Sequence, residues 1–353
     1  MKDITKLSWI INNACNLKCI HCYPDSGYEH KREFAECDFE KLSTNLKNIH
    51  FHRVFLSGGE PILDTNFYKY LQIAKSISDE VFVCSNGTLL TDSKLDELTT
   101  NGVNGIVLSC QAIDAENSLK IYGNKRVASL IFSAIERILN RNLALSVEIS
   151  LMKQNIENLD KIIKSLLSIN VKSISFKRLL PVGRGDSDKI GLSKEENYRI
   201  LKSIYEWQIN NADIRFNVHD TLYGTILFDH FKEISNDEGL LNWLHGFSCR
   251  AGTKWIGIDP QGNVSPCPIL LYKDILIGNV LDTPLTKILS DSSLITLFQK
   301  IEEHPDNSCK YGSICLGCRA TVISKTGNLY GKDPMCVHKN CVCPICNEKR
   351  QAE

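Results

Sequence analysis

The distribution of cysteines constrains this chain more than any other feature of its sequence. Three of the fifteen cysteines lie close together near the start, at Cys15, Cys19 and Cys22. Nine more are concentrated in the last third of the chain, between Cys249 and Cys346. The remaining three are isolated: Cys37, Cys84 and Cys110. A fold for this sequence has to bring each concentration of thiols to a site that uses them.

The cellular compartment decides what such clustered thiols do. The first residues lack the apolar segment and the small-residue cleavage site of an export signal, so we expect a cytoplasmic protein. Cytosolic thiols are kept reduced and are more often metal ligands or catalysts than disulfides. No apolar run approaches the length of a membrane span, and the 41 basic and 41 acidic side chains cancel. We therefore expect neither a membrane nor a nucleic acid as partner.

Short apolar runs alternate with amphipathic helical stretches from residue 8 to about residue 210. Helix start signals follow nearly every run, such as Thr91 before Leu95 and the capping box that begins at Ser193. This order predicts an α/β fold whose parallel sheet is either open or curled into part of a barrel, with function at the carboxyl ends of the strands. The predicted strands are Ser8–Asn13, Arg53–Ser57, Glu80–Ser85, Gly105–Gln111, Leu145–Leu151 and Ser173–Arg178.

The periodic pattern ends near residue 212, and the sequence beyond Cys249 consists of short pieces separated by turn residues. Such a stretch has too little apolar periodicity for a conventional core, so we expect its cysteines to organise it around metal. The predicted division is a core at 1–215, a helical bridge at 216–248, and a small cysteine-rich domain with short hairpins at 249–353.

The first group of cysteines follows the first predicted strand directly. Three thiolates in this short segment, Cys15, Cys19 and Cys22, are able to wrap one metal centre. Iron–sulfur cubanes usually take four cysteine ligands, so a compact set of three leaves one iron open to another ligand. The alternative is a structural zinc site completed by His21 or by a distant ligand.

Polar and glycine residues also end several of the later strands. Gly58, Gly59 and Glu60 end the second strand, where glycine permits close backbone approach and Pro61 holds Glu60 extended over the sheet edge. The same placement recurs on three further strands, at Ser85-Asn86-Gly87, Ser109 and Lys177-Arg178. Polar groups at one edge of successive strands are typical of a binding face.

The motifs together resemble the radical S-adenosylmethionine (SAM) superfamily over roughly residues 7–215. The resemblance implies a partial (β/α)6 TIM-like barrel with a catalytic [4Fe–4S] cluster held by Cys15, Cys19 and Cys22. The open iron would chelate the amino and carboxylate groups of SAM. The residues that would contact the cofactor are Tyr23, Gly58, Gly59, Glu60, Asn86, Ser109 and Arg178, with Gly58, Gly59 and Glu60 near the methionyl amine.

One segment departs from the family pattern. Where many relatives read Ser-Leu-Asp-Gly at the fourth strand, this chain has Ser109-Cys-Gln-Ala112, and the usual Arg-Gly that follows is Tyr122-Gly123. Ser109 is retained, while the other polar contacts from this segment to SAM or substrate have no counterpart here.

The C-terminal third is similar to the SPASM extension of radical SAM enzymes that mature peptides, proteins and some cofactors. The match rests on Cys249, twelve residues, Gly262, four residues and Cys267, and on the ending Asp333-Pro-Met-Cys336. It implies one or two auxiliary [4Fe–4S] clusters, whereas paired zinc ribbons are the alternative. The metal ligands that the resemblance assigns form two sets of three: Cys249, Cys267 and Cys318 for one cluster, and Cys309, Cys315 and Cys336 for the other.

Each of these sets lacks a fourth cysteine. Asp306 stands where the family often has one, and it would either bind iron or cap a turn. The tail cysteines Cys341, Cys343 and Cys346 would hold zinc, hold a further cluster, complete an auxiliary site, or form a redox-active or incidental segment.

The resemblance implies an oxidoreductase-type maturase that cleaves SAM reductively, with reduced flavodoxin or ferredoxin as electron donor. The 5′-deoxyadenosyl radical would abstract hydrogen from a peptide or protein side chain. The alternative is maturation of a small haem-type tetrapyrrole, because Pro181–Gly185 and Cys318-Arg319 are also similar to enzymes that remodel haem precursors. The short segment before the first strand, without a further domain for peptide capture, weighs against the peptide substrate. A multi-cluster electron carrier is a third hypothesis, in which Gly58-Gly59-Glu60 would have no use.

Two isolated cysteines lie beside predicted site residues. If Ser85 and Ser109 both point toward the cofactor, their neighbours Cys84 and Cys110 point outward toward the helices. Both cysteines are then expected to be buried, inert packing residues.

Overall fold

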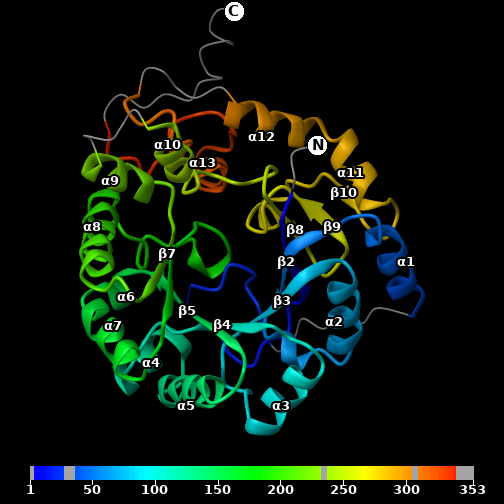
Figure 1. Cartoon of the computed structure of the whole chain (residues 1–353), viewed down its shortest axis with the longest axis horizontal. Helices are drawn as coiled ribbons and strands as arrows, with labels where there is room; N and C mark the ends of the chain where they lie inside the picture. The colour runs from blue at the N-terminus through cyan, green and yellow to red at the C-terminus, as the bar shows by residue number, and fades with distance from the viewer. Residues whose placement is uncertain (1–3, 28–35, 232–236, 304–308, 339–353) are drawn as a thin grey trace, which may run out of the picture.

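The computed structural model describes residues 4–27, 36–231, 237–303 and 309–338. Strands alternate with helices along most of the chain (Figure 1). The strands are β1 (Lys6–Asn12), β2 (Phe51–Gly58), β3 (Ser78–Ser85), β4 (Gly105–Ser109), β5 (Ala144–Leu151), β6 (Ser173–Arg178), β7 (Arg215–His219), β8 (Trp255–Ile258), β9 (Asn263–Ser265) and β10 (Gly278–Asn279).

The helices α2 to α8 form an outer ring around these strands (Figure 1). The α-helices are α1 (Glu36–Leu46), α2 (Phe67–Ser76), α3 (Asp92–Thr100), α4 (Ala115–Tyr122), α5 (Val127–Leu139), α6 (Lys153–Ile156), α7 (Leu159–Ser168), α8 (Lys194–Asn210), α9 (Tyr223–His230), α10 (Glu238–His245), α11 (Leu285–Asp291), α12 (Ser293–Glu303) and α13 (Arg319–Thr326). Short 3₁₀ turns include η1 (Pro61–Leu63), η2 (Gly183–Gly185) and η4 (Leu270–Lys273).

All strands belong to one sheet with the order β10-β9-β8-β1-β2-β3-β4-β5-β6-β7. Strands β1 to β7 run parallel, and the six predicted strands are all present. The predicted α/β architecture, a partial barrel followed by short hairpins, is therefore confirmed. Strand β7 is additional: it starts at Arg215, the last residue of the predicted core, and runs into the predicted bridge.

Strand β8, from the cysteine-rich part of the chain, extends the barrel on the other side. It pairs in parallel with β1, from Lys6 opposite Trp255 to Trp9 opposite Ile258. The indole nitrogen of Trp255 donates a hydrogen bond to Ser8 Oγ at 2.9 Å. Its ring also meets the imidazole of His219 on β7, with ring centroids 6.3 Å apart. The two ends of the parallel array thus face each other across this aromatic contact.

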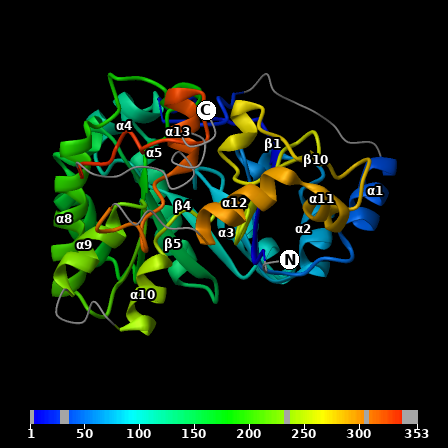
Figure 2. The ribbon, with the colours of Figure 1, turned by 90° about the horizontal axis from the view of Figure 1, so that it is seen from above.

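The helix faces that cover the barrel follow from the sequence period. In α5, buried residues recur at i, i+4, i+7 and i+8, beginning at Val127 and Ile131, which makes one apolar stripe along the helix. Helices α11 and α12 follow the hairpin and lie on the same side of the molecule as α1 and α2 (Figure 2). Asn45 of α1 donates to the carbonyl of Val280 at 2.8 Å, so distant segments join there. No helix of the described residues is long and apolar enough to cross a membrane.

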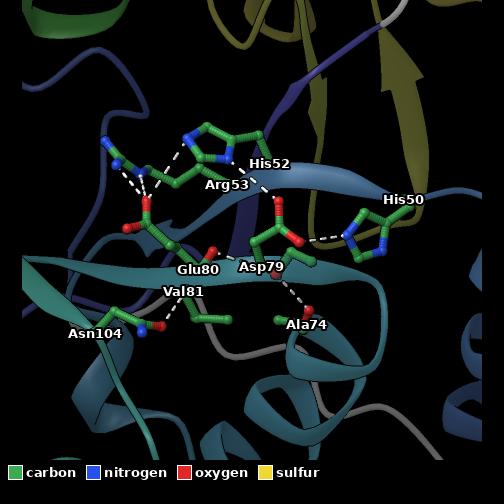
Figure 3. Close-up of polar contacts among 9 residues, drawn as sticks. His50, His52, Arg53, Ala74, Asp79, Glu80, Val81 and Asn104 are labelled. Carbon is green, nitrogen blue, oxygen red and sulfur yellow. Dashed lines mark hydrogen bonds and ion pairs between the residues drawn. The ribbon is translucent and has the colours of Figure 1, made fainter.

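The amino ends of β2 and β3 carry an exposed polar network (Figure 3). Arg53 forms an ion pair with Glu80, and His50 and His52 contact the two carboxylate oxygens of Asp79 at 2.8 and 3.2 Å. These residues lie at the opposite end of the strands from the motifs described above. The predicted site residues lie at the carboxyl end of the barrel.

Candidate functional site

The first three cysteines lie on the loop that follows β1. The loop is tied back by two backbone hydrogen bonds, from Cys15 N to Gly27 O and from Gly27 N to Asn13 O. N–H groups point at two of the sulfur atoms: Leu17 N and Asn86 Nδ2 lie 3.4 and 3.8 Å from Cys15 Sγ, and Ser26 N lies 3.3 Å from Cys22 Sγ. Such donors stabilise a thiolate, which is the form that binds iron.

The thiols of this loop also affect each other electrostatically. Burial raises the pKa of Cys15, and the hydrogen bond from Leu17 opposes that rise. Burial together with the neighbouring Cys15 and Cys22 raises the pKa of Cys19 to about 12. The raised pKa values of Cys15 and Cys19 fit a cationic iron centre, which would hold these residues as thiolates.

Among the residues that the structure describes, no three His, Cys, Asp or Glu side chains lie close enough to hold one metal ion. In a cubane each cysteine binds a different iron, so its ligands do not have to converge on one point.

The glycines at the end of β2 lie against the backbone of the cysteine loop. A Cβ on Gly58 would come within 2.6 Å of Asn12 O, and one on Gly59 would overlap the carbonyl of Ala14. The backbone nitrogens of Gly59 and Glu60 donate to Asn12 O and Ala14 O, at 3.0 and 2.8 Å. The motif thus packs strand end and loop together at a distance that only glycine allows.

Glu60 lies in the same motif, but its carboxylate does not extend over an open edge as the sequence suggested. The side chain is fully buried. It accepts hydrogen bonds from Ser85 Oγ at 3.0 and 3.1 Å, from Asn86 N at 2.8 Å and from Ile62 N at 3.4 Å. Burial raises its pKa from 4.5 to about 7. Glu60 therefore joins the ends of β2 and β3.

Asn86 continues this connection to the cysteine loop. Its side-chain amide donates to Asn16 Oδ1 at 2.9 Å as well as to Cys15 Sγ, and its own carbonyl oxygen accepts from Thr88. Thr88 in turn accepts from Asn16 Nδ2 at 2.7 Å. The predicted contact residue Asn86 thus orients a predicted cluster ligand.

The strand registers correct the expected orientation of Cys84. Ser85 is level with Leu108, the residue before Ser109, so Ser85 and Ser109 lie on opposite faces of the sheet. Ser109 is level with Glu148, and the field of Glu148 also acts on the thiol of Cys84. Cys84 therefore faces the barrel interior, contrary to the expectation.

Cys110 behaves as expected. It follows Ser109, which faces the interior, and its side chain is fully buried. Burial raises the pKa of its thiol to about 12. It is a packing residue on the helix side of the sheet.

Sequence reasoning named Lys177 and Tyr23 separately but did not find the polar cluster that they form with Glu148 in the barrel interior. Lys177 on β6 pairs with Glu148 on β5 at 2.5 Å, and Tyr23, directly after Cys22, lies beside Cys84 and this ion pair. Lys177 keeps 40% of its side chain exposed and Glu148 19%. Burial lowers the pKa of Lys177, but the adjacent Glu148 carboxylate outweighs this effect and raises the pKa above its usual value. These residues therefore border the space next to the cysteine loop.

Tyr272 on η4 is a second residue that the sequence did not single out. Its ring meets that of Tyr23 edge to face, with centroids 5.4 Å apart. Within the described part of the chain, its buried hydroxyl has no hydrogen-bond partner. Burial raises its pKa, and the nearby Tyr23 and Cys22 add to that effect. The cysteine-rich domain thus contributes an aromatic side chain to the site. Sequence periodicity carried no signal for it.

The unusual segment after β4 forms its own internal network. Gln111 donates to Ser109 Oγ at 2.9 Å and accepts from Ser150 N at 2.7 Å, which joins β4 to β5. Its backbone nitrogen donates to the hydroxyl of Tyr122 at 2.5 Å. Two of the residues that depart from the family pattern, Gln111 and Tyr122, therefore bond to each other.

Arg178 lies within a network of carboxylates. Its guanidinium donates to both carboxylate oxygens of Asp220 at 2.9 and 2.5 Å, and to Asp333 at 2.7 Å. Only 4% of its side chain is exposed. The structure thus places Arg178 between the barrel and the cysteine-rich domain.

The later cysteines form two groups. Cys249, Cys267 and Cys318 pack against one small apolar cluster. Burial raises the pKa of Cys267 to about 12, and the nearby Cys249 and Cys318 add to that rise. Cys309, Cys315 and Cys336 pack against the main core. Burial raises the pKa of Cys315, and the nearby Cys336 adds to that rise. These are the two predicted ligand sets, whose ligand roles stay predictions. Four further candidates lie outside the described residues: Asp306, Cys341, Cys343 and Cys346.

Comparisons with known proteins agree with this arrangement. The family model described as Radical SAM superfamily matches residues 9–166, and that described as Iron-sulfur cluster-binding domain (SPASM) matches residues 249–319. An AdoMet-dependent heme synthase of Methanosarcina barkeri is 24% identical over 344 residues, covering 94% of this chain and 96% of the relative. The mycofactocin maturase MftC of Mycolicibacterium smegmatis is 26% identical over 341 residues, covering 94% and 82%.

Solved structures show the same fold. Streptococcus suis SuiB bound to its precursor peptide SuiA has a TM-score of 0.76 at 18% identity, covering 96% of this chain and 77% of that one. The two family models describe an enzyme class that uses SAM and iron–sulfur clusters. The chain belongs to the radical SAM superfamily and carries a C-terminal SPASM domain. These domains imply SAM and iron–sulfur clusters as its cofactors.

Proposed function

We propose that this enzyme cleaves SAM reductively and directs the resulting radical at a substrate in the barrel interior. Cys15, Cys19 and Cys22 would hold the cluster that supplies the electron for cleavage. The single observation that carries the proposal is the loop itself. Three thiols are gathered there, two of them facing N–H donors, against a strand end that only glycine can form.

The surrounding residues prepare this site. Gly58 and Gly59 bring the β2 backbone onto the cysteine loop, while Glu60 fixes the end of β3 and thereby orients Asn86. Tyr23 and Tyr272 form an aromatic wall beside Cys22. We infer that substrate occupies the space bordered by this wall and by the interior ion pair, shielded there from bulk water.

For the substrate, we propose a peptide or protein side chain. The support comes from relatives named as maturases and from the fold shared with an enzyme solved with its precursor peptide. A reduced flavodoxin or ferredoxin would provide electrons. Oxidation, crosslinking or epimerisation of the side chain are outcomes compatible with a radical formed in this space.

A second candidate is a haem-type precursor. The specific observation in its favour is that a relative named as a heme synthase aligns over 96% of its own length. Hydroxyl groups on the inner faces of β5 and β6, such as Ser146 and Ser175 at 2.9 Å from each other, together with Lys177, offer polar contacts for its carboxylates.

The test is SAM cleavage by anaerobically reconstituted, reduced protein. We expect 5′-deoxyadenosine and methionine from the wild type and none from Cys15→Ala. Cys37→Ala, which changes an exposed cysteine on α1, is the matched control and should cleave SAM normally. Equal cleavage by Cys15→Ala and the wild type would show that the first cluster has been assigned to the wrong residues.

A second assay separates the substrates. Iron-coproporphyrin III and candidate precursor peptides are supplied in parallel, and mass spectrometry follows each. Oxidative decarboxylation of the porphyrin, with no mass change in any peptide, would replace the peptide proposal with the second candidate.

A further inference from the structure

Arg178 connects three segments that are far apart in the chain. It ends β6, Asp220 follows β7, and Asp333 belongs to the cysteine-rich domain. The three side chains are almost completely buried, with 4%, 1% and 2% exposed. One cation and two anions are thus enclosed together between the barrel and the SPASM domain.

Both carboxylates are held by further hydrogen bonds. Asp220 also accepts from Leu222 N at 2.9 Å and from Asn197 Nδ2 at 2.8 Å. Asp333 also accepts from Cys318 N at 2.8 Å and from Met335 N at 2.9 Å. All four oxygens therefore have protein partners, so the network is rigid and keeps its charges.

The bond to Cys318 N brings the network to the auxiliary cysteines. Cys318 belongs to one predicted ligand set, and Cys315 belongs to the other. The charges of Arg178 and Asp333 act on the sulfur atoms of both residues. The ion pair therefore lies beside the two groups of thiols rather than within one of them.

Lys177, the residue before Arg178 on β6, points to the opposite face of the sheet. Lys177 is level with Ser150 and His219 in the sheet and reaches the interior ion pair with Glu148. The end of β6 thus presents one cation to the substrate space and the next to the SPASM domain. The substrate space and the auxiliary cysteines therefore lie on either side of the end of β6.

We propose that Arg178 is a positioning residue that fixes the auxiliary cysteines against β6 and sets the charge around their clusters, rather than a ligand of SAM. This inference rests on the proposed function, because it requires that the two sets of cysteines bind iron–sulfur clusters. A cluster gains a negative charge on reduction, so nearby buried charges shift its reduction potential.

The test is an EPR-monitored redox titration of reconstituted protein. Asp220→Asn removes one negative charge and should shift an auxiliary midpoint potential upward. Arg178→Gln removes the positive charge and should shift it downward. The double variant restores the net charge of the wild type and should return the potential close to its original value. A residue with only a structural role would not produce opposite shifts that cancel.

Two further measurements keep the test decisive. Arg141 also pairs with two aspartates, Asp92 and Asp96, but on the surface, so Arg141→Gln is the matched control and should leave the potentials unchanged. Arg178→Lys should bind SAM with wild-type affinity by isothermal titration. A weaker affinity would overturn the proposal and support a role for Arg178 in SAM binding.

The remaining outcomes separate this inference from the proposed function. Shifts of the same sign in Asp220→Asn and Arg178→Gln, or no shifts, would overturn the inference while SAM cleavage persists. If the wild type does not cleave SAM but the auxiliary midpoint potentials shift in opposite directions as predicted, the proposed function would be wrong and this inference would stand. If Arg178→Gln fails to fold, two measurements still test the inference: the upward shift of the auxiliary midpoint potential in Asp220→Asn, and the SAM affinity of Arg178→Lys.

Discussion

Ser85 donates a hydrogen bond to Glu60, with its Oγ 3.0 Å from Oε1 and 3.1 Å from Oε2. This contact crosses from β3 to the loop after β2 and lies on the helix side of the sheet. Glu60 is therefore an internal brace whose buried carboxylate has three hydrogen-bonding partners. Its protonation is linked to the stability of the fold as well as to the shape of the site.

The stability of the apo-protein should fall as pH rises through Glu60's titration. Its pKa is about 7 in the folded protein and 4.5 in the unfolded chain, so the folded state binds more protons between these values. The contribution is fully present below pH 4.5 and is lost as pH passes 7, by about 3 kcal/mol in total. Urea denaturation between pH 5 and pH 8 measures it. The slope should be smaller in Glu60→Gln, and equal slopes would refute this linkage.

Gly59→Ala should disrupt the cysteine loop. The added Cβ would overlap the carbonyl of Ala14, so strand end and loop must separate, lowering the free energy of unfolding by about 2 kcal/mol. Gly27→Ala is the control, because it lies in the same loop with nothing within 4 Å of its Cβ. Urea denaturation and iron content after reconstitution are measured for both variants. Equal iron loading in Gly59→Ala and the wild type would contradict the prediction.

Cys84→Leu and Cys110→Leu should fail in different ways. Cys110 is buried against the core, so a larger side chain there should lower stability by about 1–3 kcal/mol without affecting SAM binding. Cys84 faces the interior, so the same change should leave the unfolding midpoint nearly unchanged. It should reduce SAM cleavage about tenfold by crowding Tyr23. The reverse pattern would restore the orientation expected from the sequence.

Iron and sulfide analysis should give about twelve of each per chain if three cubanes are present. Replacing Cys249 and Cys267 together by alanine should remove about four of each and leave SAM cleavage intact. Zinc is measured on the same samples. Iron near four per chain in the wild type, with zinc making up the remainder, would reject two auxiliary clusters.

The sequence was sufficient for the six barrel strands that carry short apolar runs. It did not predict β7, because Arg215, Asn217 and His219 make its inner face polar and leave only two apolar side chains. Strand β8 was placed in a separate hairpin. Its pairing with β1 depends on contacts between opposite ends of the chain, which local patterns do not encode.

The site was predicted less completely than the fold. Motif spacing located the cysteine loop and the glycines, because these features are local. The orientation of Cys84 depended on the register between β3 and β4, where a shift of one residue reverses the face. The ion pair between Glu148 and Lys177, and the approach of Tyr272 to Tyr23, arise from tertiary packing. Arg178 was chosen for its place at a strand end, but only the fold shows its carboxylate partners.

The pairing of β1 with β8 has a consequence for synthesis of the protein. Strand β1 leaves the ribosome long before β8, its partner on one side, has been translated. At typical rates of elongation this interval is on the order of tens of seconds. An unpaired strand edge attracts other chains during that time. The nascent polypeptide therefore has an unpaired strand edge until the cysteine-rich domain emerges. Pairing of β8 with β1 then protects this edge from aggregation.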